Sequence, residues 1–539
     1  MTTAADVLVE GLRAHGVTHL FGMPGSHSTA IYDALHRLAT IRTLLIRNEQ
    51  AAAFAADGFA RVTARPGVVC TTAGPGATNA LTGIAEAWAD SIPVLLLSGQ
   101  VNVRDLDREC GNYHELDLEA VFRPVTKWAM TVRRPQDVSW AVGKAFQAMT
   151  TGRPRPAALF LPQDLLRGDA SPSANRLGFS QPGRPIPPAS EVQEAAAMLA
   201  GSSRPIILAG GGAVWSGAGE SIERLARRLN APVITTLNGK GILDERHPLS
   251  LGHARSPRAS AALLKADAML ALGCRFTEVL TDWRRMRVPP RLIHVDLEPS
   301  QIGANYHVAI GIVGDARTVV DQLLASLPDQ SDQPGENHPF PHWWSTVEPA
   351  ERPHPEWLIE TLRASLPETA VVFTDACEIG YRMQAEWTAY GPRQFFYPSN
   401  FITLGWAFPA ALGAAVAVPG HVVSVSGDGG FLMTAQELAT AARYRLPVIA
   451  VIHNDSTFGA IKNIQQRVHQ GRYLDVDLNN PDFPALAASF GVPGCRATCP
   501  AELAEAVRQA LQRQGPTLIE VPDRWRFLRD LAVPLPSDP

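Results

Sequence analysis

The sequence has 539 residues, of which 46% are hydrophobic and 19% are charged. This length predicts three or four domains of a soluble globular protein, and a net charge of −4 gives no reason to expect nucleic-acid binding. The N-terminus carries Asp6 and Glu10 where a secretion signal would be basic and then apolar. The six cysteines form no CxxC pair. We therefore expect a cytoplasmic protein without a disulfide framework or a zinc site.

Two stretches rich in proline, glycine or serine interrupt the regular pattern of the chain. They span residues 168–189 and 328–355, and they are typical of linkers between domains. The sequence therefore predicts three domains of similar size, at residues 1–167, 190–327 and 356–539.

Within each predicted domain, short apolar runs alternate with helical patterns. In chain order, the clearest are strand Val68–Thr72, helix Thr78–Trp88, strands Pro93–Leu97, Pro205–Leu208, Pro232–Thr235, Met269–Leu272, Leu292–Val295 and Val422–Ser426, helix Phe431–Tyr444, and strand Pro447–Ile452. This alternation predicts an α/β protein with three doubly wound parallel sheets covered by helices on both faces. The first and third domains share a strand, a glycine turn, a long helix and a strand, so we interpret them as related folds around a different middle domain.

Residues 394–420 contain no charged side chain and could be misread as a membrane span. The stretch includes Pro398, Pro409 and Pro419 together with several glycines, and it continues into a strand pattern. These features favour a buried helix and strand, so we expect no membrane association.

A glycine-rich turn follows the strand at Val422–Ser426. Gly427, Gly429 and Gly430 let main-chain N–H groups approach an anion at the positive end of a helix. Asp428 in the same turn would repel a phosphate unless a cation lay between them, and Mg²⁺ prefers oxygen ligands. Adjacent parallel strands would bring the oxygen-rich loop 453–459 beside Asp428. An ordinary turn of a doubly wound sheet is the alternative, and the second loop favours the metal site.

The segment GDGGFLMTAQELATAARYRLPVIAVIHNDSTFG resembles the cofactor motif of thiamine-diphosphate enzymes of the acetolactate synthase and benzoylformate decarboxylase superfamily. The resemblance covers essentially the whole chain. It implies that the side chains of Asp428 and Asp455 and the carbonyl of Thr457 bind Mg²⁺. Asp455, at 455 − 428 = 27 residues from Asp428, stands where the family more often has asparagine, and it adds a negative charge. Asn454 is the alternative ligand if the loop is shifted by one residue.

The first domain resembles the pyrimidine-binding domain of the same superfamily, and Glu49 matches its activating glutamate. A carboxyl group that forms a hydrogen bond with the aminopyrimidine ring nitrogen favours the imino form of the cofactor. The imino nitrogen then removes the C2 proton of the thiazolium. A dry pocket raises the pKa of the carboxyl group, which favours this hydrogen bond. Leu404 matches the aliphatic wedge beneath the bent cofactor. The resemblance implies further cofactor contacts at Pro24, Thr72, Asn79, Thr403, Gly427, Gly429 and Gly430.

The predicted substrate pocket differs from that of true acetolactate synthases. His27 matches an active-site histidine of benzaldehyde lyase, and Ser26 matches a pocket serine of benzoylformate decarboxylase. His114 stands where benzaldehyde lyase and acetolactate synthase have glutamine, and Gln100 matches a glutamine near the cofactor in the synthases. Because histidine titrates near neutrality, His27 and His114 can exchange protons with the substrate. Simple packing is the alternative role for either histidine.

Two further segments bear on the acceptor and on a second cofactor. The stretch 461–467 lacks the tryptophan that holds the second keto acid in acetolactate synthases, so a different acceptor is expected. Gly210–Gly212 lacks the spacing of a dinucleotide fingerprint. Gly273–Phe276 resembles part of the FAD region of related synthases, whereas Thr236–Gly241 does not resemble their flavin-contacting loop. FAD is therefore the less favoured possibility.

The resemblance implies a magnesium-dependent enzyme that forms or cleaves a C–C bond of a 2-keto acid or acyloin, with an aldehyde or keto compound as second substrate. The alternative is a 2-keto acid decarboxylase that releases an aldehyde. A non-catalytic homologue is a third possibility, against which Glu49, Asp428 and Leu404 together argue. In this superfamily the glutamate and the diphosphate site of one centre come from different subunits, which implies a homodimer or homotetramer.

Overall fold

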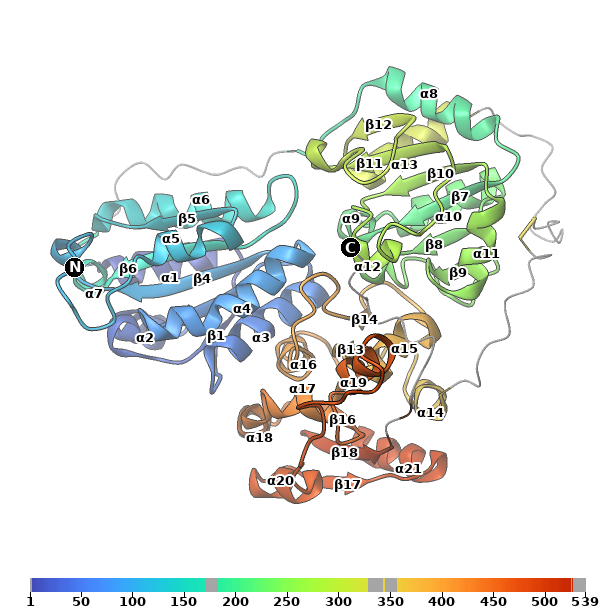
Figure 1. Ribbon diagram of the computed structural model, residues 1–539. Coiled ribbons are helices and arrows are strands. Elements are labelled where there is room, and N and C mark those ends of the chain that lie inside the picture. Colours follow the sequence, from blue (N-terminus) through green and yellow to red (C-terminus); the bar gives the residue numbers. More distant parts are fainter. Residues whose placement is uncertain (1, 171–182, 328–342, 345–355, 525, 527–539) are drawn as a thin grey trace.

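The computed structural model describes residues 2–170, 183–327, 343–344, 356–524 and 526. The described chain forms three six-stranded sheets, in blue and cyan, in green, and in orange and red (Figure 1). Every pair of neighbouring strands within these sheets is parallel. The α/β fold class is thus confirmed. Most of the two predicted linkers lies outside the described residues, so the domain boundaries stay a prediction.

The first sheet has the strand order β2-β1-β3-β4-β6-β5. Its strands are β1 (His19–Gly22), β2 (Arg42–Leu45), β3 (Gly67–Thr71), β4 (Val94–Gln100), β5 (Trp128–Thr131) and β6 (Ala157–Pro162). The helices of this part are α1 (Ala4–Ala14), α2 (Thr29–Leu38), α3 (Glu49–Thr63), α4 (Pro75–Asp90), α5 (Leu118–Phe122), α6 (Val138–Thr150) and α7 (Gln163–Arg167), with short 3-10 turns between several of them.

The middle sheet has the strand order β12-β11-β10-β7-β8-β9, which is the order of a dinucleotide-binding fold. Its strands are β7 (Pro205–Ala209), β8 (Val233–Thr235), β9 (Ser250–His253), β10 (Ala268–Leu272), β11 (Arg291–Asp296) and β12 (Ile310–Val313). Its helices are α8 (Ala189–Ala200), α9 (Gly211–Ser216), α10 (Gly219–Leu229), α11 (Pro257–Lys265), α12 (Glu278–Thr281) and α13 (Ala316–Ser326).

The third sheet has the order β14-β13-β15-β16-β18-β17, which repeats that of the first sheet strand for strand. Its strands are β13 (Val371–Thr374), β14 (Phe395–Phe396), β15 (Val422–Gly427), β16 (Val448–Asn454), β17 (Gly494–Arg496) and β18 (Thr517–Pro522). Its helices are α14 (Trp357–Ser365), α15 (Glu378–Glu386), α16 (Ala407–Ala415), α17 (Asp428–Leu432), α18 (Leu438–Tyr444), α19 (Gly459–Val468), α20 (Phe483–Ser489) and α21 (Pro500–Leu511).

The single helix predicted from Phe431 to Tyr444 is wrong. The chain enters helix α17 already at Asp428, ends it at Leu432, makes a 3-10 turn at Ala435–Glu437 and then forms α18. The break has a local cause, because the Thr434 hydroxyl donates to the carbonyl of Gly405 and Glu437 turns to the main chain of Arg47. Contacts with other parts of the chain thus override the helical pattern.

The first and third parts of the chain pack together through helices α3 and α16. A Cβ atom at Gly58 would lie 2.1 Å from the carbonyl oxygen of Ala410, and one at Gly413 would lie 1.8 Å from that of Ala55. The two backbones can approach this closely only because both positions are glycine. Helix α16 lies in the uncharged stretch 394–420 and is buried, as predicted. Among the described residues, no helix combines the length and apolar composition needed to cross a bilayer.

Candidate active site

The turn after strand β15 forms a cradle that admits only glycine. Gly427 is the N-cap of α17, and a Cβ atom there would lie 2.8 Å from the Cβ atom of Cys377. A Cβ atom at Gly429 would lie 2.6 Å from the ring of Phe458. The first main-chain N–H groups of a helix have no acceptor inside the helix. The turn therefore places the first main-chain N–H groups of α17 beside Asp428, where an anionic diphosphate could accept from them.

Two carboxylates meet beside this turn, because β15 and β16 are neighbours and pair Gly427 with His453. Burial, and then the negative charge of Asp455, raise the pKa of Asp428 to about 6. Burial also raises the pKa of Asp455. Asp428 is buried and Asp455 is half-buried, and the charge of Asp455 disfavours the ionised form of Asp428. These two acids are a donor set that fits a divalent cation, since a cation removes the repulsion. The residues present thus fit Mg²⁺.

The neighbouring Asn454 has a fully engaged side chain. Its amide nitrogen donates to Glu520 over 2.7 Å, and its oxygen accepts from Ser456 and from Asn480. Asp455 accepts from the main-chain N–H of Thr457 over 3.1 Å. Of the two alternatives at this position, the geometry favours Asp455 as the cation ligand. The described residues contain no cluster of three or more His, Cys, Asp and Glu side chains fit for a metal, so the third ligand would be the predicted Thr457 carbonyl.

Glu49 is the first residue of helix α3, which packs on the first sheet. The side chain of Asn48 caps this helix by accepting from the N–H of Gln50. Its own carboxyl is buried and accepts from the Asn79 side-chain amide over 3.1 Å. A Cβ atom at Gly76 would lie 3.1 Å from the other carboxyl oxygen. Glu49 is thus held in a dry pocket by the start of helix α4, with Asn79 as a positioning partner.

The two predicted histidines lie together. The ring centroids of His27 and His114 are 5.4 Å apart, and Tyr113 stacks on His114 at 3.8 Å. The Nδ1 atom of His27 lies 3.1 Å from the Ser26 hydroxyl and 3.4 Å from the Thr72 hydroxyl. Burial, together with the His114 charge, lowers the pKa of His27, so the neutral ring is favoured near neutrality. A neutral histidine can accept a proton from a substrate hydroxyl.

Gln100 and Pro24 are placed differently from these groups. Both ends of the Gln100 side-chain amide are used by the main chain, since its oxygen accepts from Val101 over 2.8 Å and its nitrogen donates to the carbonyl of Leu116 over 3.0 Å. In this arrangement Gln100 fixes the loop that carries Tyr113 and His114. Pro24 is exposed on the chain segment before Ser26.

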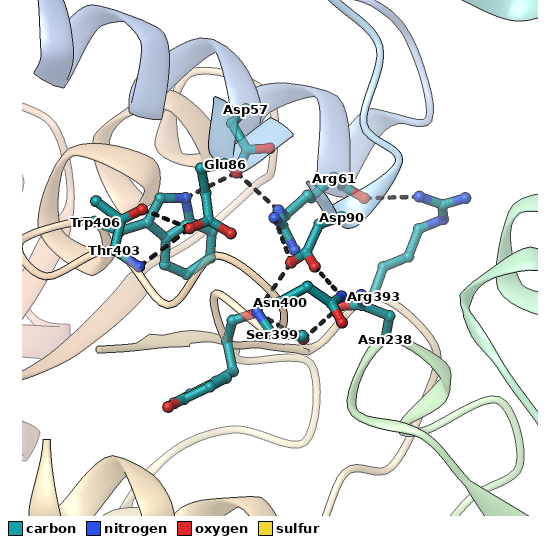
Figure 2. Close-up of polar contacts among 11 residues, drawn as sticks. Asp57, Arg61, Glu86, Asp90, Asn238, Arg393, Ser399, Asn400, Thr403 and Trp406 are labelled. Atoms are coloured by element: carbon teal, nitrogen blue, oxygen red, sulfur yellow. Dashed lines mark hydrogen bonds and ion pairs between the residues drawn. The ribbon is translucent and has the colours of Figure 1, made fainter. Parts of the chain in front are cut away.

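Thr403 and Leu404 lie on a segment between β14 and α16, with Leu404 packed on the core of the third sheet. The segment has positive φ angles at Ile402 (60°) and Gly405 (77°). Thr403 donates to the carboxyl of Glu86 on helix α4 through its N–H and its hydroxyl (Figure 2). The predicted wedge is therefore held by a helix of the first sheet.

The predicted residues thus form two groups, one around Glu49 and the histidines and one around Asp428 and Asp455. Within the part of the chain that the structure describes, no hydrogen bond joins the Glu49 group to the Asp428 group. Sequence reasoning missed Asn480, which donates to both Asp428 and Asn454, and Glu437, which accepts from the N–H of Arg47. Neither residue belongs to a motif with a set spacing, so the sequence carried no signal for them.

A separate cavity of about 630 Å³ lies where the three parts of the chain meet. It is lined by residues of each part, including Arg153, Gly211, Arg275, Asp296 and Arg393. Its volume is that of a small-molecule site. The expectation that FAD is absent therefore stays a prediction.

The sheets and the two residue groups define an α/β protein built to hold a diphosphate compound beside a buried carboxyl group. Three descriptions of the thiamine pyrophosphate (thiamine diphosphate) enzymes match the chain. They are the N-terminal TPP binding domain at residues 2–121, the central domain at residues 192–323 and the C-terminal TPP binding domain at residues 379–521.

Curated relatives align with nearly the whole chain. The probable acetolactate synthase large subunit of Methanocaldococcus jannaschii is 36% identical, over 96% of this chain and 91% of that protein. The acetolactate synthase isozyme 3 large subunit of Escherichia coli is 34% identical, over 95% and 93%. The acetolactate synthase of Arthrospira platensis is 33% identical, over 96% and 94%. The chain belongs to the thiamine-diphosphate-dependent enzymes.

Proposed function

We propose that this enzyme uses thiamine diphosphate and Mg²⁺ to decarboxylate a 2-keto acid and to join the resulting acyl unit to a second carbonyl compound. The observation that carries the proposal is the pair of acids, the buried Asp428 and the half-buried Asp455, beside a turn that leaves no room for a Cβ atom at Gly427 and Gly429. The names of the relatives support carboligation of the acetolactate synthase type.

When bound, thiamine diphosphate supplies the carbon nucleophile that attacks the keto group. Asp428, Asp455 and the Thr457 carbonyl would hold Mg²⁺ against the diphosphate, which the N–H groups of Gly429 and Gly430 would contact. Glu49 would donate a hydrogen bond to the pyrimidine ring, and Asn79 keeps that carboxyl in place. Leu404 would support the cofactor from below.

The histidine pair would move protons on the substrate side. His27 lies next to Ser26 and Thr72, so its ring orientation is set by two hydroxyl groups. Among the described residues, no group forms a hydrogen bond with the buried Nδ1 atom of His114, so a substrate oxygen could become its partner. Tyr113 covers the pair and is 68% exposed, so it would contact the side chain of the substrate.

A 2-keto acid decarboxylase is the second candidate, and the Ser26–His27 contact of 3.1 Å favours it. The two candidates differ in product. We would incubate the protein with thiamine diphosphate, Mg²⁺ and pyruvate, with and without aldehyde acceptors. Acyloin or acetohydroxy-acid products support the carboligase, and free aldehyde as the sole product supports the decarboxylase.

We also propose a homodimer or a homotetramer with the active centres between subunits. Several large apolar side chains of the third part of the chain are exposed, since Phe401, Met433 and Ile461 are about half exposed and Leu474 is 72% exposed. Another subunit that covered these side chains would remove them from water. Sedimentation of the purified protein tests the assembly, and a monomer at micromolar concentration would contradict it.

A further inference from the structure

Residues 399–406, which we call the wedge segment, are bound to helices of the first sheet by carboxyl groups of α3 and α4 (Figure 2). Glu86 of α4 accepts from Thr403 through the main-chain N–H (3.1 Å) and through the hydroxyl (2.7 Å). Asp57 of α3 accepts from the indole N–H of Trp406 over 2.8 Å. The segment thus depends on side chains that are more than 300 positions away in the sequence.

Among the described residues, Glu86 differs from its acidic neighbours because it forms no ion pair. Arg61 binds Asp57 at 2.8 Å and Asp90 at 3.0 Å. In the same part of the chain, the hydrogen bonds of the Glu86 carboxyl come from Thr403, and its second oxygen is buried without a partner. Burial, and then the charge of Asp90, raises the pKa of Glu86 to about 8. A structural ion pair would need a charged group here, whereas the contact with Thr403 needs only an acceptor oxygen.

The backbone beside Thr403 requires such a support. Ile402 has a φ of 60°, which is an outlier for a β-branched residue. A β-branched residue in this region is strained and persists only where its surroundings hold it there. The two hydrogen bonds to Glu86 hold the residue that follows, and Thr434 holds the carbonyl of Gly405 at the other end.

Helix α4 also contacts the activating carboxyl. Asn79 donates to Glu49, and it lies 86 − 79 = 7 residues before Glu86 on the same helix. Seven residues correspond to about two helical turns, or about 10 Å along one face. One rigid helix therefore carries the partner of Glu49 near its start and the support of the wedge near its end.

We propose that Glu86 is a positioning residue for the cofactor, because its carboxyl fixes Thr403 and Leu404 relative to the Asn79–Glu49 pair. This inference rests on the proposed function, in which Leu404 supports the cofactor. In the proposed homodimer the two ends of α4 face different active centres, so Glu86 would keep the two halves of the catalytic machinery in register.

The first test uses the protein without its cofactor. Hydrogen–deuterium exchange of peptides that cover residues 399–406 would be compared in the wild-type protein, Glu86→Ala, Glu86→Gln and Arg393→Gln. Arg393→Gln is the matched control, because Arg393 joins the first and third parts through the carbonyl of Arg61 and forms no hydrogen bond with Thr403 in the described part of the chain. We expect about tenfold faster exchange in Glu86→Ala, and a change within about threefold in Glu86→Gln, which keeps an acceptor oxygen.

The second test measures the rate at which bound thiamine diphosphate exchanges its C2 proton for deuterium, without substrate. We expect Glu86→Ala to slow this exchange about tenfold and Glu86→Gln to restore most of it. Thr403→Val, which removes only the hydroxyl donor of a half-exposed residue, would slow it about threefold and serves if Glu86→Ala does not fold. If the wild-type protein exchanges the C2 proton and these variants match it, the positioning role is wrong. If the wild-type protein itself does not accelerate the exchange, the proposed function fails instead.

Discussion

The first and third sheets have the same strand order and differ at the turn after their third strand. In the first sheet, β3 leads through Thr72 and Gly74 into α4, where Gly74 faces His114 and Gly76, in the first turn of the helix, faces Glu49. In the third sheet, β15 leads directly into α17, which begins at Asp428. The same position in the fold thus adjoins a carboxyl group and a histidine in one sheet and the proposed cation site in the other. One acid at the start of a helix makes this difference.

The largest effect is expected from the first sheet. Replacing Glu49 by Gln removes the proton-bearing group of the proposed site, so we expect kcat to fall about a thousandfold, with a melting temperature close to that of the wild-type protein. Steady-state kinetics with pyruvate measure it, and Glu10→Gln on the exposed face of α1 is the control. Activity undiminished in Glu49→Gln would contradict the role given to this carboxyl.

The next largest effect is expected from Asp428 in the third sheet. Asp428→Ala removes a proposed Mg²⁺ ligand, so we expect thiamine diphosphate to bind about a hundredfold more weakly, in a titration followed by tryptophan fluorescence. Asp455→Asn keeps an oxygen ligand and should cost only about threefold. Removal of Mg²⁺ by a chelator should abolish activity in the wild-type protein, and added Mg²⁺ should restore it. Equal binding by all three proteins would exclude this metal site.

The histidine pair is the next smaller test. His27→Asn keeps a polar side chain but loses the neutral ring nitrogen that can accept a proton, and we expect kcat/KM to fall about tenfold to a hundredfold. His36→Asn on the exposed face of α2 is the matched control. A value for His27→Asn equal to that of the control would indicate that His27 is only packed.

The smallest effect concerns the contact between the two regions. Because the pKa of Glu86 is raised from 4.5 to about 8, the folded protein keeps a proton between these pH values that the unfolded chain releases. The free energy of unfolding therefore falls as the pH rises through this window, by up to about 1.4 kcal/mol per pH unit for one such group. Urea unfolding at pH 5.5, 6.5 and 7.5 should show that the free energy of unfolding depends less steeply on pH in Glu86→Gln than in the wild-type protein. Identical slopes would show that Glu86 is ionised in the folded protein.

Much of this architecture could be predicted from the sequence, because apolar strands and glycine turns are local signals. The likeness of the first and third domains and the approach of the 453–459 loop to Asp428 both follow from such patterns, and the sheet register confirms them. The break in the helix after Asp428 could not be predicted, because distant partners of Thr434 and Glu437 cause it. Glu86 was missed for the same reason, since its partner Thr403 belongs to another sheet.

The most direct test of this account asks whether the first sheet of one subunit completes the third sheet of another. Glu49→Gln and Asp428→Ala proteins would be unfolded, mixed in equal amounts and refolded together, then assayed at a thiamine diphosphate concentration that saturates the wild-type protein but leaves Asp428→Ala without cofactor. Shared centres predict that half of the dimers are mixed and that each has one intact centre, so about a quarter of the wild-type activity should return. If each chain forms its own centre, every centre carries a defect and no activity will return.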